Sequence, residues 1–255
     1  MKFIVNNYHY EAITSTFPGG EEYIRLPSKL PIHGANIIIQ PNIRSSKEVM
    51  QLLMLNDALR IYAHRNAIFT LDLGYLPYAR QDRVCAKGES FSLRVFCKLI
   101  NSLEFDEVKV ADCHSDVGLA LLNNLTHYSQ LKCIVDDEDI YEMIRSCDVV
   151  VAPDAGATKK ALEVANHFGK PLVQCLKTRE NGKISVRVLD DISDKKAVVV
   201  DDICDGGGTF LALASALRGE EPKELNLYVT HGIFSNGKEC LLDHYDNVKA
   251  YKEWT

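Results

Sequence analysis

A run of apolar residues that ends on two acids and then breaks into glycines is the strongest chemical signal in this chain. The run is Ala197-Val-Val-Val-Asp-Asp-Ile-Cys-Asp-Gly-Gly-Gly-Thr209, and a helix-like stretch at 210–217 comes directly after it. Because Gly206–Gly208 carry no Cβ, successive backbone N–H groups can converge on an anion, and the helix adds the positive end of its dipole. The pattern predicts a phosphate-binding junction, with an unliganded Asp-Gly turn as the alternative.

The acids in this run suit the sugar of the same ligand. Asp201 and Asp202 are expected at the carboxyl end of the strand, where they would accept hydrogen bonds from vicinal ribose hydroxyls or hold a metal through water. Thr209 would cap the helix or bond a phosphate oxygen. Clustered carboxylates repel one another and turns seldom need so many glycines, so a ligand is favoured over a plain turn. The run therefore predicts a site for a ribose phosphate.

Two clusters in the first half of the chain also carry candidate chemistry. In Gly74–Arg83, Arg80 and Arg83 follow a predicted strand, and their guanidinium groups would clamp a polyphosphate. The alternative, equally favoured by this motif alone, is a surface loop whose arginines pair with Asp82 and neighbouring acids. His114 follows another predicted strand and would ligate a divalent ion or meet a phosphate, although a lone histidine is more often structural.

Two clusters in the second half are similar in design. Val149–Gly156 repeats strand, acid and glycine ahead of a helix, so Asp154 would share a cation with the histidine of the first half. The alternative is an ordinary strand–turn–helix junction. In Cys175–Lys183 a strand is expected to run into a polar, mobile loop, where Lys177 and Arg179 would project to the same side of extended backbone. Two cations on such a loop suit the charge on a transferring phosphoryl group, whereas a solvated basic hairpin is the common case.

Short apolar runs alternate with amphipathic stretches, which is the pattern of βαβ units around a parallel sheet. Strands are predicted at 36–39, 67–71, 108–111, 148–151, 171–175, 197–200 and 225–229. Helices are predicted at 92–103 and 157–168, and from Ser45, whose Ser-x-x-Glu spacing to Glu48 forms a capping box. The chemical clusters thus come after predicted strands, where open α/β sheets bind their ligands.

Composition limits the class of protein. The 255 residues, 46% of them hydrophobic, are enough for one large core or two moderate ones. A net charge of −6 without a dense Lys/Arg stripe argues against a nucleic-acid surface. No apolar run approaches membrane-spanning length, so we expect a cytoplasmic enzyme with no membrane partner. The eight cysteines lack C-x-x-C spacing, which indicates neither a disulfide framework nor a zinc site.

Taken together and in this order, the clusters resemble the ribose-phosphate diphosphokinases, the synthetases of phosphoribosyl pyrophosphate. The resemblance covers most of the chain and rests on the segments Phe17–Glu21, Pro77–Arg83, Asp112–His114, Pro153–Gly156, Lys177–Arg179, Asp201–Thr209 and Val229–Ile233. It implies an α/β fold of two tandem phosphoribosyltransferase-type, Rossmann-like domains with mainly parallel sheets. With a boundary at the acidic stretch 136–139, residues 1–135 would form the ATP side and residues 136–255 the ribose-phosphate side.

The resemblance also implies roles for individual residues. The expected ATP ligands are Phe17, Glu21, Arg80, Gln81 and His114, the first two reaching adenine in a neighbouring subunit of a homo-oligomer, a dimer or a hexamer. The expected ligands of magnesium are His114 and Asp154, and the mobile transition-state clamp is formed by Lys177 and Arg179. Ribose hydroxyls would meet Asp201 and Asp202, and the 5-phosphate would meet Asp205, Gly206, Gly207, Gly208 and Thr209.

The implied reaction is attack by the ribose 1-hydroxyl of ribose 5-phosphate on the β-phosphorus of ATP, which moves a diphosphate and releases AMP. The sequence departs from the family pattern at three places that bear on this reaction. Gly19 stands where a polar side chain is usual, and Val84 and Cys85 replace polar or basic residues. Gly206 and Gly207 replace a hydroxyl residue and a small residue, which removes a phosphate ligand and makes room.

The room around these glycines leads to the hypothesis of a larger 5-substituted acceptor, such as ADP-ribose, that would yield its 1-diphosphate. Two other interpretations of the motifs stay open. A phosphoribosyltransferase that consumes the activated sugar shares the ribose loop, but Arg80-Gln81 and Lys177-Thr-Arg179 argue against it. A regulatory homologue without catalysis would have lost ligands, whereas His114 and Asp154 are present.

Overall fold

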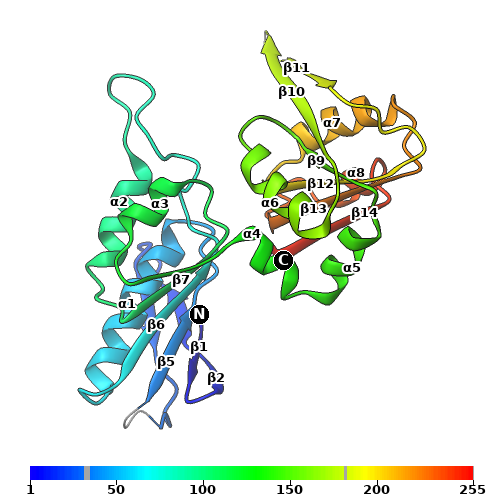
Figure 1. The fold of residues 1–255 in the computed structure, drawn as a ribbon. Helices are drawn as coiled ribbons and strands as arrows, with labels where there is room; N and C mark the ends of the chain where they lie inside the picture. The colour runs from blue at the N-terminus through cyan, green and yellow to red at the C-terminus, as the bar shows by residue number, and fades with distance from the viewer. Residues whose placement is uncertain (32–34, 181–182, 255) are drawn as a thin grey trace. The chain divides into compact units, whose positions relative to one another are not determined.

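The computed structural model describes residues 1–31, 35–180 and 183–254. The chain forms two compact units, Met1–Tyr128 and Ser129–Thr255 (Figure 1). This division falls after Tyr128, whereas the sequence suggested a boundary after residue 135. Helix α4 (Gln130–Val135) lies between the two positions, and its residue Ile134 is fully buried in a core of the second unit. Burial of that side chain explains why α4 belongs to the second unit.

The first unit is built around a mixed sheet. Along the chain its elements are β1 (Lys2–Val5), β2 (Tyr8–Glu11), β3 (Ile13–Thr16), β4 (Glu22–Arg25), β5 (Asn36–Gln40), α1 (Ser46–Tyr62), β6 (Ile68–Gly74), α2 (Ser92–Asn101), β7 (Glu107–Ala111), α3 (Asp116–Leu121) and β8 (Leu125–Tyr128). The sheet order is β2-β1-β5-β6-β7-β8, with parallel pairing from β5 to β8. Strand β1 is antiparallel to both neighbours, and β3 and β4 form a separate hairpin.

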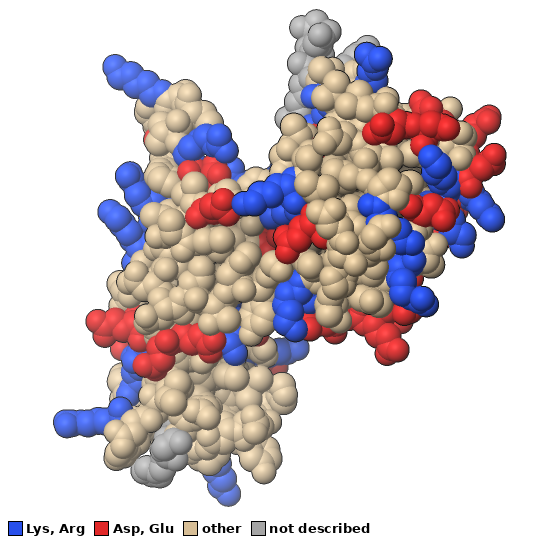
Figure 2. Space-filling model, in the orientation of Figure 1, with Lys and Arg blue, Asp and Glu red and all other residues tan. Residues whose placement is uncertain are grey.

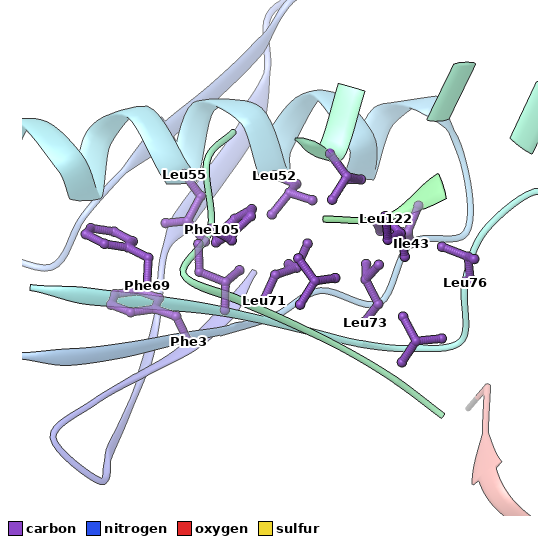
Figure 3. Packing of buried hydrophobic residues seen from close by; sticks show 14 of the residues in the cluster. Phe3, Ile43, Leu52, Leu55, Phe69, Leu71, Leu73, Leu76, Phe105 and Leu122 are labelled. Carbon is purple, nitrogen blue, oxygen red and sulfur yellow. The ribbon is translucent and has the colours of Figure 1, made fainter. Parts of the chain in front are cut away.

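Helix α1 shows how the sequence fixes this unit. The predicted capping box is present, because the Ser45 N–H donates to Glu48 Oε2 at 2.7 Å and the Ser45 hydroxyl accepts from the first turn. Leu52, Leu55 and Leu59 lie three and four residues apart, so they share one face of the helix and are fully buried. Figure 3 shows Leu52 and Leu55 above apolar side chains of the sheet. Each buried leucine stabilises the unit by about 1.5–3 kcal/mol.

The second unit is also a sheet between helices. Its further elements are α5 (Glu138–Ser146), β9 (Val149–Ala152), α6 (Thr158–Phe168), β10 (Leu172–Glu180), β11 (Lys183–Val188), β12 (Lys196–Cys204), α7 (Gly208–Arg218), β13 (Glu224–Gly232), α8 (Glu239–Leu242) and β14 (Asn247–Glu253). The sheet order is β11-β10-β9-β12-β13-β14, parallel throughout except for the antiparallel β10–β11 hairpin. Both sheets are mainly parallel, so the predicted α/β fold is confirmed.

Strand β12 is buried on both faces, as its uninterrupted apolar run predicted. Val199 packs in one core cluster with residues of α7, while Val198 and Val200 pack in another with residues of α6. Alternate residues of a strand point to opposite faces, so an apolar residue is needed at every position when helices cover both sides. This double burial holds the end of β12 rigidly, and the glycine loop begins there.

Each predicted strand and helix is confirmed, but three local expectations were wrong. The polar stretch after Cys175 continues as strand β10, because β11 pairs with it residue by residue from Cys175 to Glu180. Gly207 is the N-cap of α7, so Thr209 lies inside the first turn and does not cap the helix. Strand β12 does not end at residue 200 as predicted but runs to Cys204, so Asp201 and Asp202 lie within its carboxyl-terminal half.

Charged side chains of both signs are mixed on the surface. Figure 2 shows Lys and Arg interspersed with Asp and Glu over the visible face. Within the described residues, no helix combines the length and the apolar character needed to span a membrane.

Candidate active site

The junction between β12 and α7 has the predicted strand–loop–helix form. Gly207 has a φ of +79°, a conformation that favours glycine, and α7 begins at the next residue. A Cβ built on Gly208 would have no neighbouring heavy atom within 4 Å, so the space directly beside the helix start is open. In the described structure no side chain caps α7, which leaves its first-turn N–H groups for water or an anion.

The backbone donors at the junction include those of the first turn of α7, which begins at Gly208. Cys204 ends the strand that leads into the loop, and burial raises the pKa of its thiol to about 12, so the thiol is protonated at neutral pH.

Asp154 and Lys177 form a partly buried ion pair. Lys177 Nζ lies 2.5 Å from Asp154 Oδ2, and the two side chains are 19% and 29% exposed. The other carboxylate oxygen of Asp154 accepts backbone N–H bonds from Gly156 at 2.9 Å and Ala157 at 3.2 Å. Burial alone would raise the pKa of Asp154, but the Lys177 ammonium and these backbone donors hold it below its usual value. Asp154 is therefore a fixed carboxylate at neutral pH.

The two acids of β12 differ in their surroundings. Burial, together with the negative charges of Asp202 and Asp154, raises the pKa of Asp201 well above its usual value. Asp202 is buried and lies 3.4 Å from the Lys160 ammonium of α6. Gln130 of α4 donates from Nε2 to the Asp201 carbonyl at 2.8 Å and so fixes the backbone under both acids. Three carboxylates and two ammonium groups thus gather around the ends of β9, β10 and β12.

Sheet register explains why these residues meet. Ala152 at the end of β9 pairs with Gln174 of β10, and Val151 pairs with Val199 of β12. The three strands are parallel neighbours, so the residues that follow them emerge at the same edge of the sheet. The extension of β10 beyond β9 carries Lys177 over that edge. The side chain of Arg179 lies outside the described part of the structure.

The first unit contains a pocket of about 540 Å³ lined by the predicted polyphosphate segment. Its walls include Arg80, Gln81, Arg83 and His114. The backbone turns sharply there, with φ values of +61° at Gly74 and +63° at Tyr78, and brings residues 80–83 beside the start of α2. The cationic and amide side chains of this wall carry the hydrogen-bond donors that a phosphate chain would need.

Asp82 is paired with one of the two arginines of this pocket, Arg83, and so distinguishes it from Arg80. It is buried and accepts from Arg83 Nε at 2.9 Å, and this bond, opposed by burial, holds the pKa of Asp82 below its usual value. Arg83 therefore fits the alternative considered for the motif, an arginine paired with its neighbouring acid. Arg80 and Gln81 lie on the exposed part of the wall.

The predicted adenine residues lie elsewhere in the first unit. Phe17 and Glu21 are at the tip of the β3–β4 hairpin, where the Phe17 N–H donates to the Glu21 carbonyl at 2.8 Å. Phe17 is 53% exposed and packs edge to face against Tyr23. An exposed aromatic ring at a hairpin tip is suited to contact with another molecule. Within their unit these two residues do not line the pocket of Arg80 and His114.

Within each unit the structure brings the predicted residues together only in part. His114 joins Arg80 and Gln81 in the first unit, and Asp154 joins Lys177 and Asp201 in the second. His114 and Asp154 belong to different units, so their shared cation stays a prediction.

Sequence reasoning missed Lys160, Gln130, Ser235 and Asn236. Lys160 had a signal: it lies in the first turn of α6, which contains no acid, although cations are unfavourable at that end of a helix. A lysine there indicates an acidic partner nearby, and Asp202 is that partner. Gln130 donates to the Asp201 carbonyl, the Ser235 hydroxyl to Asp205, and the Asn236 side chain to the Gly206 carbonyl. These partners are distant in sequence, so the three residues gave no local signal.

The aspartate side chains at this edge of the sheet suit a single magnesium ion that is also bound by phosphate oxygens. Across the described ranges, no three His, Cys, Asp or Glu side chains gather closely enough to form a metal cage. Mg²⁺ is commonly held by one or two carboxylates together with phosphate oxygens and water. Asp154, whose pKa is held below its usual value, fits such a role.

Comparison with known proteins agrees with this geometry. The family model of the phosphoribosyl transferase domain matches residues 135–255. A ribose-phosphate pyrophosphokinase of Pyrococcus abyssi is 32% identical over 228 residues, which cover 87% of this chain and 76% of that protein. One of Bradyrhizobium diazoefficiens is 29% identical over 231 residues, covering 89% and 72%.

A solved structure supports the same relationship. The crystal structure of phosphoribosylpyrophosphate synthetase from Mycobacterium smegmatis superposes with a TM-score of 0.73 at 27% identity, covering 87% of this chain and 72% of that one. The match extends through both units and not only through the transferase domain. The resemblance inferred from the motifs is confirmed: the chain belongs to the ribose-phosphate pyrophosphokinase family, a family of enzymes.

Proposed function

We propose that this protein transfers the β,γ-diphosphate of ATP to the 1-hydroxyl of ribose 5-phosphate and releases AMP. The observation that carries the proposal is the Lys177–Asp154 ion pair beside Asp201, at the strand edge where the glycine loop begins. The 1-hydroxyl oxygen forms a bond to the β-phosphorus, the bond from that phosphorus to the α,β-bridging oxygen breaks, and the hydroxyl proton goes to solvent. Family membership supports the same reaction.

In this proposal the second unit holds the acceptor. Asp201 and Asp202 accept hydrogen bonds from the ribose hydroxyls, while Asp205 and the loop through Thr209 surround the 5-phosphate at the start of α7. Lys177 exchanges Asp154 for an oxygen of the transferring group, where its charge stabilises the transition state. Arg179 is proposed as the second cation of that clamp.

The first unit holds ATP in this proposal. Arg80 and Gln81 bind the phosphates in the 540 Å³ pocket, and His114 closes its wall. Magnesium, held by Asp154 with His114 and the phosphates, supplies charge neutralisation. Phe17 and Glu21 reach adenine from a neighbouring subunit of a homo-oligomer, which the exposed hairpin tip supports.

The test is incubation of the purified protein with ATP, magnesium and ribose 5-phosphate, with measurement of AMP and of the mass of the sugar product. A gain of one diphosphate on the sugar is expected. Lys177→Ala should lower kcat by about 100-fold to 1000-fold, because it removes a cation aimed at developing charge. Arg83→Ala serves as the matched control, since Arg83 is already paired with Asp82. AMP formation without sugar modification, or no AMP at all, would reject the proposal.

A second acceptor is favoured by one observation. A Cβ built on Gly208 would have no heavy atom within 4 Å, and Gly206 and Gly207 present no side chains to a ligand. A ribose with a larger 5-substituent, such as ADP-ribose, would use that room and become its 1-diphosphate by the same transfer. Parallel reactions with ADP-ribose decide between the acceptors. If neither acceptor yields AMP, a phosphoribosyltransferase or a regulatory homologue becomes the better explanation.

A further inference from the structure

His114 stands on a turn that leaves the sheet of the first unit in an unusual conformation. Asp112, the first residue after β7, is buried and has a φ of +38°. Left-handed backbone is uncommon for a residue with a side chain, and it persists where the surrounding contacts hold it. The turn at 112–114 therefore depends on the contacts that its neighbours make with it.

The end of strand β8 supplies two of these contacts. The Asp112 N–H donates to the Tyr128 carbonyl at 2.7 Å, which continues the pairing of Ala111 with Tyr128 in the sheet. The Cys113 N–H donates to Nε2 of His127 at 3.2 Å. The first bond is made by backbone alone, whereas the second requires an acceptor in the side chain at position 127. Because a ring nitrogen that accepts a hydrogen bond carries no proton, the His127 imidazole is neutral in this arrangement.

Helix α3 holds the side chain of Cys113 from another direction. A Cβ built on Gly118 of this helix would lie 2.5 Å from Cys113 Sγ and 2.9 Å from Leu76 Cδ2. Cys113, Leu76 and Gly118 are all buried, so the thiol fills the space that a larger residue of α3 would take. Cys113 is thus fixed at its backbone by His127 and at its side chain by α3.

The position of Cys113 matters for the pocket because His114 is the next residue. His114 is exposed and lines the 540 Å³ pocket together with Arg80 and Gln81. Those two residues follow β6, whereas His114 follows β7, so their spacing across the pocket depends on how each turn leaves the sheet. Groups that bind a ligand must be held near their productive geometry by the residues around them. The bond to His127 provides this support for His114.

We propose that His127 is a positioning residue for His114: its ring nitrogen holds the Cys113 peptide and so sets where His114 stands on the wall of the polyphosphate pocket. Within the described part of the unit, His127 itself lies outside that wall. The inference rests on the proposed function, in which ATP occupies this pocket, and it deepens that function by naming a residue that prepares the ATP site without touching the ligand.

The test compares His127→Leu, which removes the acceptor, with His127→Gln, whose amide oxygen can accept from the Cys113 N–H. The probe is α,β-methylene-ATP with magnesium, in which a carbon replaces the oxygen of the bond that the transfer would break. By calorimetric titration, His127→Leu should bind the probe about threefold to tenfold more weakly than the original protein, and His127→Gln should restore binding to within about twofold. Equal binding by the original protein and His127→Leu would overturn the inference.

The matched control is His9→Leu, which makes the same change at an exposed histidine of β2, on the opposite edge of the same sheet. It should leave binding of the probe unchanged. A histidine that only stabilised the fold would lower the midpoint of thermal unfolding, followed by circular dichroism, without changing the Kd of the probe. In steady-state kinetics, His127→Leu should raise the KM for ATP and leave the KM for ribose 5-phosphate as it is, because the proposed acceptor site belongs to the second unit.

A measurement without ligand separates this inference from the proposed function. The NMR signals of the His114 imidazole, assigned with His114→Gln, should shift in His127→Leu and return in His127→Gln. If the original protein does not bind the probe but these signals shift and return, only the proposed function fails. If the probe binds and His127→Leu changes neither its Kd nor the His114 signals, only this inference fails.

Discussion

The ion pair between Lys177 and Asp154 should stabilise the second unit even without substrate. The perturbation is a cycle of Lys177→Met, Asp154→Asn and the double variant. Asparagine keeps an oxygen that can accept from the Gly156 and Ala157 N–H groups, so the substitution removes the charge while preserving the turn. Methionine keeps most of the length of lysine. The cycle thus isolates the interaction between the two charges.

The magnitude depends on separation and burial. At an effective dielectric constant of about 20, two unit charges 2.5 Å apart attract by about 7 kcal/mol, and desolvation of both groups offsets most of this. Exposed pairs contribute about 0.2–1 kcal/mol, whereas breaking buried pairs costs about 3–5 kcal/mol. The side chains here are 19% and 29% exposed, which lies between these cases. We expect a coupling free energy of about 1–2 kcal/mol.

Urea unfolding monitored by tryptophan fluorescence measures this coupling free energy in the second unit, which contains both the ion pair and the tryptophan. Trp254 is the only tryptophan of the sequence and lies in the second unit, where its backbone N–H donates to the Gly232 carbonyl at 3.0 Å. The free energy of unfolding is obtained for all four proteins at pH 7. If the two single effects add to within about 0.3 kcal/mol, the pair contributes nothing and the reasoning is refuted.

The pH dependence of stability tests the same pair a second time. The pKa of Asp154 is lower in the folded state than in the unfolded chain, so its contribution is fully present above the unfolded value near 3.8. It is lost as the pH falls through the folded pKa. The coupling should therefore be constant between pH 5 and 7, within about 0.5 kcal/mol, and decline below pH 4. A coupling that grew with acidity would contradict the assignment.

Three other predictions concern different parts of the molecule. Asp201→Asn should raise the free energy of unfolding by about 1 kcal/mol at pH 7 and leave it unchanged near pH 3. The reason is that the pKa of Asp201 is raised in the folded state, so its charged form destabilises the fold only above the pKa of the unfolded chain. Urea unfolding at both pH values checks this. Arg80→Ala should raise the KM for ATP by about tenfold to 100-fold, and Arg83→Ala should change it less, as steady-state kinetics will show. Leu52→Ala should destabilise the first unit by about 3–5 kcal/mol, measured by hydrogen exchange of its sheet amides.

The parallel sheets could be predicted because their strands are buried on both faces. When acids and glycines come directly after an uninterrupted apolar run such as Val198–Val200, a strand buried on both faces is the simplest explanation of the run. The antiparallel strands were missed for the opposite reason. Strand β3 is exposed along its whole length, and β2 is mostly exposed, so neither shows an apolar signal. Their pairing partners, and not their own composition, decide their structure.

In the candidate site, too, contacts between residues distant in sequence could not be predicted. Local motifs identified Asp154, Asp201 and the glycine loop, because each stands directly after or within a buried strand. Asn236 lies thirty positions beyond Gly206 in the sequence, and only the parallel pairing of β12 with β13 brings the two together. A bond that depends on sheet register leaves no local pattern. Sequence reasoning could note the missing side chain at position 206 but not the group that occupies its place.

Charge balance links these features into one account of the proposed reaction. Asp154, Asp201 and Asp202 face two ammonium groups, those of Lys160 and Lys177, so one negative charge is in excess and the pKa of Asp201 is raised. If Lys177 leaves Asp154 for a transferring phosphoryl oxygen, the excess at the acids grows. A magnesium ion arriving with the phosphates would offset that change. In the proposed reaction, Lys177 stays bound to Asp154 until a metal ion takes its place on that carboxylate, so metal binding and the release of Lys177 should be coupled.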